Sequence, residues 1–133
     1  MKKTLIYPEL SYKLNGILFM CHNKLERYRS EKEYGDFLEK AFKDHEVSFE
    51  REKALPASFE GEKDRRNIVD FFIEDKLVLD IKAKLIISKD DYFQMQRYLK
   101  ACNCRLGIIA NFRQKYLRPK RIVNKSYEGI VSA

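Results

Sequence analysis

Apolar residues recur at helical spacing in the first third of the chain. Leucine, isoleucine and cysteine side chains form one stripe between residues 9 and 25, which predicts an amphipathic helix over this range. Ser30 and Glu33 then have the spacing of a capping box, and a second apolar face follows them. We therefore expect a second helix that begins after Ser30 and ends near Asp44.

The middle of the chain has the shorter periodicity of strands. Apolar alternations over residues 47–61, interrupted by Pro56, predict two modest strands or a hairpin. Two apolar runs, Ile68 to Ile73 and Leu77 to Ile81, are separated by only three polar residues. This second pattern predicts a tight antiparallel hairpin.

The last third of the chain predicts another helix and further strands. Ser88 and Asp91 have capping spacing and begin the third helix, and the continuous apolar run over 106–110 is typical of a buried strand. A last strand should end at Val123. The order helix, helix, strands, helix, strand predicts a single α/β domain over residues 1–133, with helices packed on a mixed central sheet.

Composition places the chain among globular proteins, since 44% of its residues are hydrophobic and 35% are charged. No apolar stretch approaches the ~20 residues of a membrane span, and the first ten residues lack the apolar core of a signal peptide. Three cysteines and two histidines do not have zinc spacing, so we expect reduced structural thiols. These features predict a cytoplasmic protein without a membrane partner.

Positive charge gathers near the end of the chain. The net charge is +7, and nine basic residues but no acidic ones lie between Tyr92 and Tyr127. Clustered lysine and arginine suit a polyanion because they release its counterions, although a solvated basic surface is the alternative. We expect nucleic-acid contacts from the end of this stretch: Arg113, Lys115, Arg118, Lys120 and Arg121.

The predicted hairpin also carries charge. Asp80 and Lys82 share one face because successive strand residues point to opposite sides, and a turn centred on Asp75 places Asp70 opposite Asp80. Opposed side chains have Cβ atoms ~4.5–5.5 Å apart, where like charges are destabilising. A divalent cation such as Mg²⁺ or Mn²⁺ would compensate, with Lys82 orienting or activating the attacking water. The alternative is an exposed polar face with a simple Asp–Lys pair.

The pattern of Asp70 followed by Asp80-Ile81-Lys82 resembles the Asp…(Asp/Glu)-x-Lys signature of the PD-(D/E)XK, or restriction-endonuclease-like, nuclease superfamily. Nearly the whole chain, from Tyr7 to Phe112, is similar to the bacterial GxxExxY family within it. The similar positions are Tyr7 to Ser11, Gly16, His22 to Leu25, Glu31, Tyr34, Val69 to Phe71, Leu79 to Ala83, Gln94, Tyr98 and Leu99, Leu106 and Gly107, and Asn111 and Phe112. Tyr28 and Arg113 depart from the pattern, which has glycine at both places.

The resemblance implies a restriction-endonuclease-like fold and assigns further residues to the site. It implies that Glu31 completes the metal shell or positions water, and that Gln94 holds the lysine or the scissile phosphate. Glu31 could instead be a carboxylate that favours the helix N-terminus, and Gln94 a surface amide. His22 and His45 lack a partner pattern for nucleophilic catalysis, so we expect satisfied or capping roles.

The function expected from these patterns is metal-dependent hydrolysis of phosphodiester bonds in nucleic acid, with DNA favoured over RNA. Asp70, Asp80 and Glu31 would bind Mg²⁺ or Mn²⁺, while Lys82 and Gln94 complete the catalytic set. The alternative is a catalytically weak or inactive module that binds nucleic acid or protein on the same fold. The patterns leave open whether the chain forms a homodimer.

Overall fold

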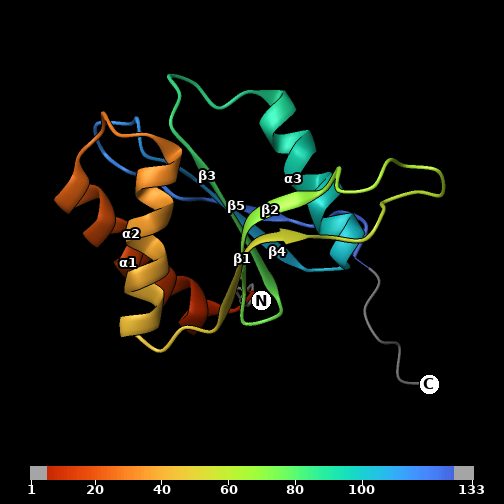
Figure 1. Ribbon diagram of the computed structural model, residues 1–133, viewed down its shortest axis with the longest axis horizontal. Coiled ribbons are helices and arrows are strands. Elements are labelled where there is room, and N and C mark those ends of the chain that lie inside the picture. Colours follow the sequence, from red (N-terminus) through yellow and green to blue (C-terminus); the bar gives the residue numbers. More distant parts are fainter. Residues whose placement is uncertain (1–5, 128–133) are drawn as a thin grey trace, which may run out of the picture.

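The computed structural model describes residues 6–127, which contain three helices and five strands (Figure 1). The helices and strands follow the predicted order along the chain. They are α1 (Pro8–Leu25), α2 (Glu31–Asp44), β1 (Phe49–Ala54), β2 (Ile68–Ile73), β3 (Leu77–Lys82), α3 (Lys89–Cys102), β4 (Leu106–Asn111) and β5 (Lys120–Val123).

The strands form one mixed sheet in the order β1-β2-β3-β4-β5. Only the β3–β4 pair is parallel, and the other neighbours are antiparallel. A parallel pair needs a crossover connection, which α3 supplies between β3 and β4. The end of β3 and the beginning of α3 therefore lie in one connection.

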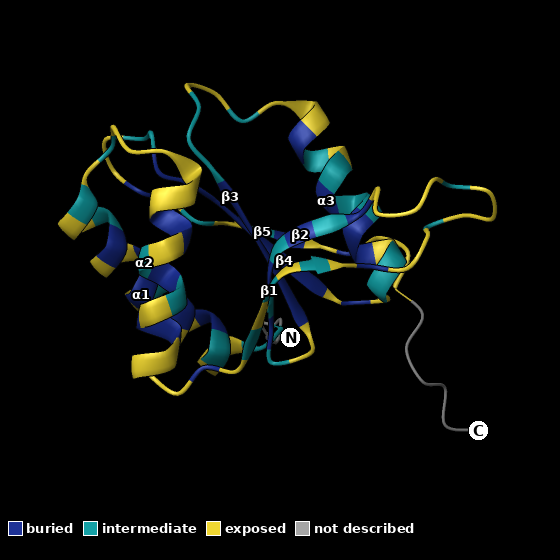
Figure 2. Ribbon diagram, in the orientation of Figure 1, coloured by how far each residue is buried: buried dark blue, intermediate teal, exposed yellow. Residues whose placement is uncertain are grey.

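The helices cover both faces of the sheet, with α1 and α2 on one side and α3 on the other (Figure 1). Each face has its own buried core (Figure 2). Leu18, Phe42 and Phe71 belong to the core beneath α1 and α2, whereas Val78 and Met95 belong to the core beneath α3. The central strand β3 contributes to both cores, which explains its nearly continuous burial.

The predicted helices, hairpin and α/β fold class are confirmed. The second helix begins with the predicted capping box, in which Ser30 Oγ accepts the Glu33 N–H and the Glu33 side chain accepts the Ser30 N–H. Pro8 opens α1 because proline suits the first turn of a helix. The three cysteines are free in the structure.

The expectation of two strands or a hairpin over residues 47–61 is wrong. Only β1 forms there, and residues 55–67 have no strand. The Leu55 N–H still donates to Asn67 O at 2.7 Å, but Pro56 follows and has no N–H with which to continue the ladder. The chain then leaves the sheet until β2 begins.

The register of the β2–β3 hairpin agrees with the predicted turn. Phe72 pairs with Val78, and the turn closes with the Lys76 N–H donating to Ile73 O at 3.0 Å. Glu74 and Asp75 have φ of 53° and 56°, the left-handed conformation that such tight hairpin turns require.

Among residues 6–127, no helix combines the length and apolarity of a membrane span.

Candidate active site

Asp70 and Asp80 meet near the ends of β2 and β3 that lie away from the turn. The regular pairing of the two strands stops at Phe71–Leu79, one residue before the aspartates, and beyond it the two carboxyl groups contact each other. Asp80 is only 4% exposed, whereas Asp70 is half-buried. Asp70 Oδ2 accepts the backbone N–H of Ile81 at 2.6 Å, so a side-chain oxygen rather than a strand carbonyl satisfies this donor.

The two carboxyl groups are electrostatically coupled. Burial raises the pKa of Asp70 to about 8, and the hydrogen bond with Asp80, the charge of Asp80 and the charge of Glu31 act in the same direction. The N–H of Ile81 opposes this shift. Without a cation, these surroundings favour the protonated form of Asp70. This proton relieves the repulsion that the register predicts.

Lys82 lies beside Asp80 on the α3 side of the sheet. Its Nζ is 3.0 Å from Asp80 Oδ2 and donates to Gln94 Oε1 at 2.8 Å. Burial acts to lower the pKa of Lys82, but the charges of Asp80 and Asp91 and the Asp80 contact raise it above the ordinary value. Lys82 is therefore a fixed cation, suited to binding an anionic oxygen rather than to accepting a proton.

The sequence analysis missed a second carboxylate near Lys82. Asp91 is buried in the first turn of α3, with its Oδ1 3.7 Å from Lys82 Nζ. It accepts the Ser88 N–H at 2.8 Å and lies 2.7 Å from Lys84 Nζ. Burial acts to raise the pKa of Asp91, but these bonds hold it below the usual value. The position of Asp91 in the capping box could be predicted from the sequence. Its approach to Lys82 and Lys84 depends on how α3 packs on the sheet.

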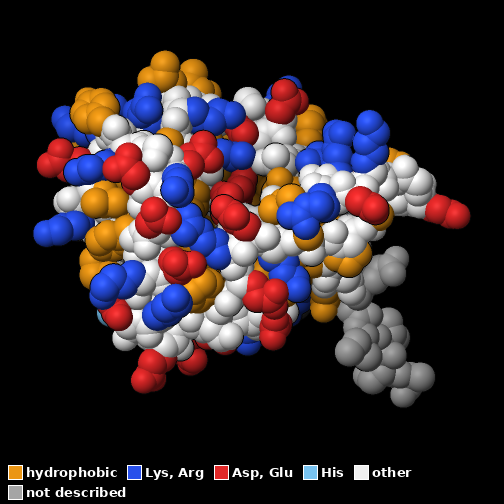
Figure 3. Space-filling model, viewed as in Figure 1, with side chains coloured by type: hydrophobic (Ala, Val, Ile, Leu, Met, Phe, Trp, Pro, Cys, Tyr) orange, Lys and Arg blue, Asp and Glu red, His pale blue; other side chains and the backbone are white. Residues whose placement is uncertain are grey.

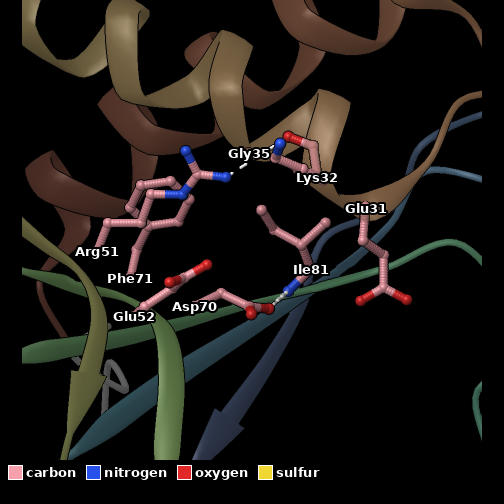
Figure 4. A pocket seen from close by; sticks show the side chains of 8 residues that line it. All are labelled: Glu31, Lys32, Gly35, Arg51, Glu52, Asp70, Phe71 and Ile81. Carbon is pink, nitrogen blue, oxygen red and sulfur yellow. Dashed lines mark hydrogen bonds between the residues drawn. The ribbon is translucent and has the colours of Figure 1, made fainter.

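Glu31 approaches Asp70 from the α2 side of the sheet, opposite to Lys82. It is exposed at the beginning of α2, and it lines a cavity of about 160 Å³ together with Asp70 and Ile81. Figure 4 shows Glu31 and Glu52 on opposite sides of Asp70. The structure thus brings Glu31 and Asp70 into one cavity, while Asp80 and Lys82 face α3.

Glu52 and Arg51 complete the other wall of this cavity, and no sequence pattern identified them. Glu52 has a φ of 51°, a left-handed conformation in the middle of a strand. Arg51 Nη1 donates to Asp36 Oδ1 at 2.7 Å, and its guanidinium lies over the Phe71 ring. A Cβ at Gly35 would collide with this guanidinium, so the glycine leaves room for the Arg51 side chain against α2. The strained backbone of Glu52 has no signature in the sequence.

The five basic residues predicted to bind nucleic acid divide into two sets. The Arg113 Nε donates to Arg27 O at 3.1 Å, and the Arg121 guanidinium donates to Ser11 Oγ and to Ile6 O. These two arginines thus support the protein's own structure. The three exposed members are Lys115, Arg118 and Lys120.

Lys120 lies in the same transverse row of the sheet as Asp80. Asp80 pairs with Ile109 on β4, and Ile109 pairs with Lys120 on β5. Two strand spacings separate the Asp80 and Lys120 backbones, a distance of about 10 Å. Lys120 and Arg118 also line a cavity of about 290 Å³ beside the loop that follows β3. Lys120 therefore lies close to Asp80 in the sheet, and Arg118 lies beside Lys120.

The histidines take the roles predicted for them. His22 Nε2 lies 2.8 Å from Gln114 O. His45 follows the last residue of α2, and its backbone N–H donates to Ala41 O at 3.0 Å. Neither residue lies with the carboxylates. The candidate site therefore contains acids, a lysine and an amide.

The Asp70–Asp80 pair fits a hard divalent cation. Both residues offer carboxylate oxygens, and Mg²⁺ is commonly held by one or two carboxylates with water and phosphate oxygens. Asp80 Oδ2 is buried and, within residues 6–127, accepts no hydrogen bond, although Lys82 is its ion-pair partner. No three His, Cys, Asp or Glu side chains of the described chain are grouped to hold a metal. The place of Glu31 in a metal shell therefore stays a prediction.

The mixed sheet, its flanking helices and the acid, acid-x-lysine hairpin have the restriction-endonuclease-like architecture. The chain belongs to the PD-(D/E)XK nuclease superfamily, whose family model matches residues 8–123. Comparisons with curated proteins and with solved structures find no match. The finer resemblance to the GxxExxY family stays a prediction.

Proposed function

We propose that this protein is a metal-dependent nuclease that hydrolyses phosphodiester bonds in nucleic acid. The observation that carries the proposal is the coupled Asp70–Asp80 pair, with Asp80 buried and Lys82 held 3.0 Å from it. Membership of a nuclease superfamily supports the same chemistry. The exposed basic residues favour a polyanionic substrate, and we propose DNA before RNA.

In this proposal Asp70 and Asp80 hold Mg²⁺ or Mn²⁺. Such a cation acts as a Lewis acid on the phosphodiester and lowers the pKa of the attacking water. Lys82 donates to an oxygen of the scissile phosphate or of the water, because its ammonium keeps its protons next to Asp80. Gln94 fixes the direction of that ammonium, and Glu31 orients water at the cavity mouth.

A binding module without turnover is the second candidate. The two candidates share the fold and the basic surface, so only chemistry separates them.

The test is cleavage of mixed DNA and RNA substrates by the purified protein, with Mg²⁺, with Mn²⁺ and with a chelator. The nuclease proposal expects cation-dependent cleavage that falls at least about 100-fold in Asp70→Asn and Asp80→Asn, because each removes a charged ligand. Asp64→Asn, in an exposed loop, is the matched control. Substrate binding without cleavage under every condition would instead support the module.

Metal binding is a separate prediction from this site. Titration calorimetry with Mn²⁺ should show binding to the wild type and to Asp64→Asn, and none to Asp70→Asn. Without metal, Asp70→Asn should be as stable as the wild type or slightly more stable, because the coupled buried carboxyl pair is removed. An unchanged Mn²⁺ affinity would show that the aspartates do not share a cation.

A further inference from the structure

A groove lies between the loop that precedes α2 and the loop that follows β4. Its volume is about 370 Å³, and Tyr28 and Tyr116 line it from the two loops. Tyr28 is 77% exposed and Tyr116 is 68% exposed, which is unusual for two large rings on one groove. Figure 3 shows hydrophobic and basic side chains intermixed over the end of the molecule where these loops lie.

Each tyrosine has a cation beside its ring. Arg27 Cζ lies 5.4 Å from the centroid of the Tyr28 ring, and Lys115 Nζ lies 5.5 Å from that of the Tyr116 ring. Both basic residues also line the groove. Among the described residues that line this groove, Glu26 is the one acid, so the groove carries more positive than negative charge.

The two loops are bonded to each other. The Arg27 Nε donates to Arg113 O at 3.0 Å, and the Arg113 Nε donates to Arg27 O at 3.1 Å. The Tyr34 hydroxyl donates to Glu26 O at 2.7 Å, and the Tyr34 ring stacks on Phe112, with centroids 4.3 Å apart. These contacts hold the groove walls in place before any ligand binds, which reduces the entropic cost of binding.

The groove adjoins the candidate active site along both walls. Tyr28 precedes Glu31 by three residues, at most about 11 Å of extended chain. The other loop begins at Phe112, whose N–H donates to Lys82 O at 2.9 Å. The two positions at which the sequence departs from the pattern it resembles, Tyr28 and Arg113, both lie in these loops.

We infer that this groove binds an unpaired segment of a nucleic-acid strand. Bases stack on Tyr28 and Tyr116, and Arg27 and Lys115 contact the phosphates. Exposed rings interleaved with cations are the means by which proteins hold single strands, since every base has a face that can stack. Along a blunt duplex the bases are paired and stacked, so their faces are not available to the two rings. The inference rests on the proposed nuclease function and names its substrate as nucleic acid with a single-stranded segment.

The experiment measures binding by fluorescence anisotropy in a chelator, so that cleavage cannot occur. The probes are a labelled single-stranded DNA, a blunt duplex of the same sequence, and that duplex with an overhang. The variants are Tyr28→Ala with Tyr116→Ala, and Tyr28→Phe with Tyr116→Phe. Tyr12→Ala is the matched control, because Tyr12 is 83% exposed on α1 outside this groove.

The double alanine variant should lose roughly tenfold affinity per ring for the single strand and the overhang, and change by less than about twofold for the blunt duplex. The phenylalanine pair keeps both rings and should bind like the wild type, as should the control. Thermal melts should show that these exposed substitutions leave the fold intact. Each single alanine variant should lose half as much single-strand affinity as the double variant on a logarithmic scale.

Single-strand affinity that survives the double alanine change, or an equal loss for single strand and blunt duplex, would overturn the inference. So would a loss in the phenylalanine pair as large as that in the alanine pair, since the hydroxyls rather than the rings would then carry the binding. These outcomes say nothing about cleavage. The metal-dependent assay on Asp70→Asn decides the nuclease proposal independently.

Discussion

At the scale of single residues, the two aspartates of the hairpin differ because their surroundings differ. Asp80 is buried on the α3 side against Lys82, whereas Asp70 borders a cavity on the α2 side and carries the raised pKa. Removing the Asp70 proton costs free energy while no cation is present. A site of this kind is suited to exchange one proton for a metal ion when substrate and cation arrive.

Glu52 has a left-handed backbone conformation that its position within a strand does not predict. A left-handed conformation costs an L-residue about 1–2 kcal/mol, and strain of this kind gathers at functional sites. Sequence analysis cannot identify such a residue, because a glutamate in a short polar strand looks like any exposed charge. The residues before and after it, Arg51 and Lys53, pair with the two neighbours of Asp70 on β2, and this places Glu52 at the cavity.

Replacing this residue with glycine should stabilise the protein. We expect Glu52→Gly to raise the free energy of unfolding by about 0.5–1 kcal/mol, because glycine accepts positive φ without strain and only part of the gain is lost to its greater unfolded-state entropy. Urea unfolding measures this change. Glu50→Gly, two residues earlier with ordinary strand geometry, should instead lower stability by a similar amount. Equal losses in both variants would show that Glu52 is not strained.

At the scale of elements, α3 positions the chemistry of β3. The helix brings Gln94 to Lys82, and its first turn brings Asp91 to Lys84. The capping spacing predicted where this helix begins, and the alternation of the hairpin predicted which strand residues share a face. The contacts between the two could not be predicted, because they depend on how the crossover connection places the helix over the sheet.

The Asp91 contacts should make stability depend on pH in a defined direction. The folded-state pKa of Asp91 is lowered, so its contribution is present above the unfolded value near 3.8 and is lost as pH falls through the folded value. Asp91→Asn should cost about 1–2 kcal/mol at pH 7, since Lys84 is partly exposed and screened. The difference from the wild type should therefore shrink as pH falls below about 3.8 and through the lowered folded-state pKa.

Denaturant unfolding across this pH range checks the Asp91 prediction, with Asp90→Asn as the control. Asp90 occupies the same turn of α3 but is exposed. A difference between the wild type and Asp91→Asn that stays constant with pH would mean that the lost contribution is not ionic.

Gly107 determines how closely α3 approaches the sheet. A Cβ at this position of β4 would clash with the side chain of Met95, which is fully buried. Gly107→Ala should therefore lower the free energy of unfolding by about 1–3 kcal/mol. Gly16→Ala on α1 is the control, because its methyl group would meet no heavy atom within 4 Å and should stabilise the helix by up to about 1 kcal/mol. A neutral Gly107→Ala would show that the α3 packing is loose.

At the scale of the whole molecule, the basic stretch serves two purposes that a charge count cannot separate. Arg113 and Arg121 place their guanidinium groups on backbone carbonyls of Arg27 and Ile6, and so join distant segments. The planar guanidinium suits such multiple bonds, whereas a lysine ammonium is more readily left in water. The fold and the hairpin could be predicted from periodicity, but the division of the cations follows from which loops meet in space.

Arg118 and Lys120 carry the part of this charge that we expect to contact phosphate. Both are exposed, and Lys120 lies in the same row of the sheet as Asp80. Replacing both with glutamine should lower duplex DNA affinity and reduce the slope of log K against log salt by about 1.8, since each lost phosphate contact removes ~0.9. Anisotropy titrations in a chelator over a range of salt concentrations measure this slope. The exposed residues Lys13 on α1 and Lys43 on α2 provide the matched double variant, which should keep the wild-type slope. The same reduction in both double variants would mean that DNA affinity depends on net charge alone. The row of the sheet that contains Asp80 and Lys120 would then have no part in positioning the substrate.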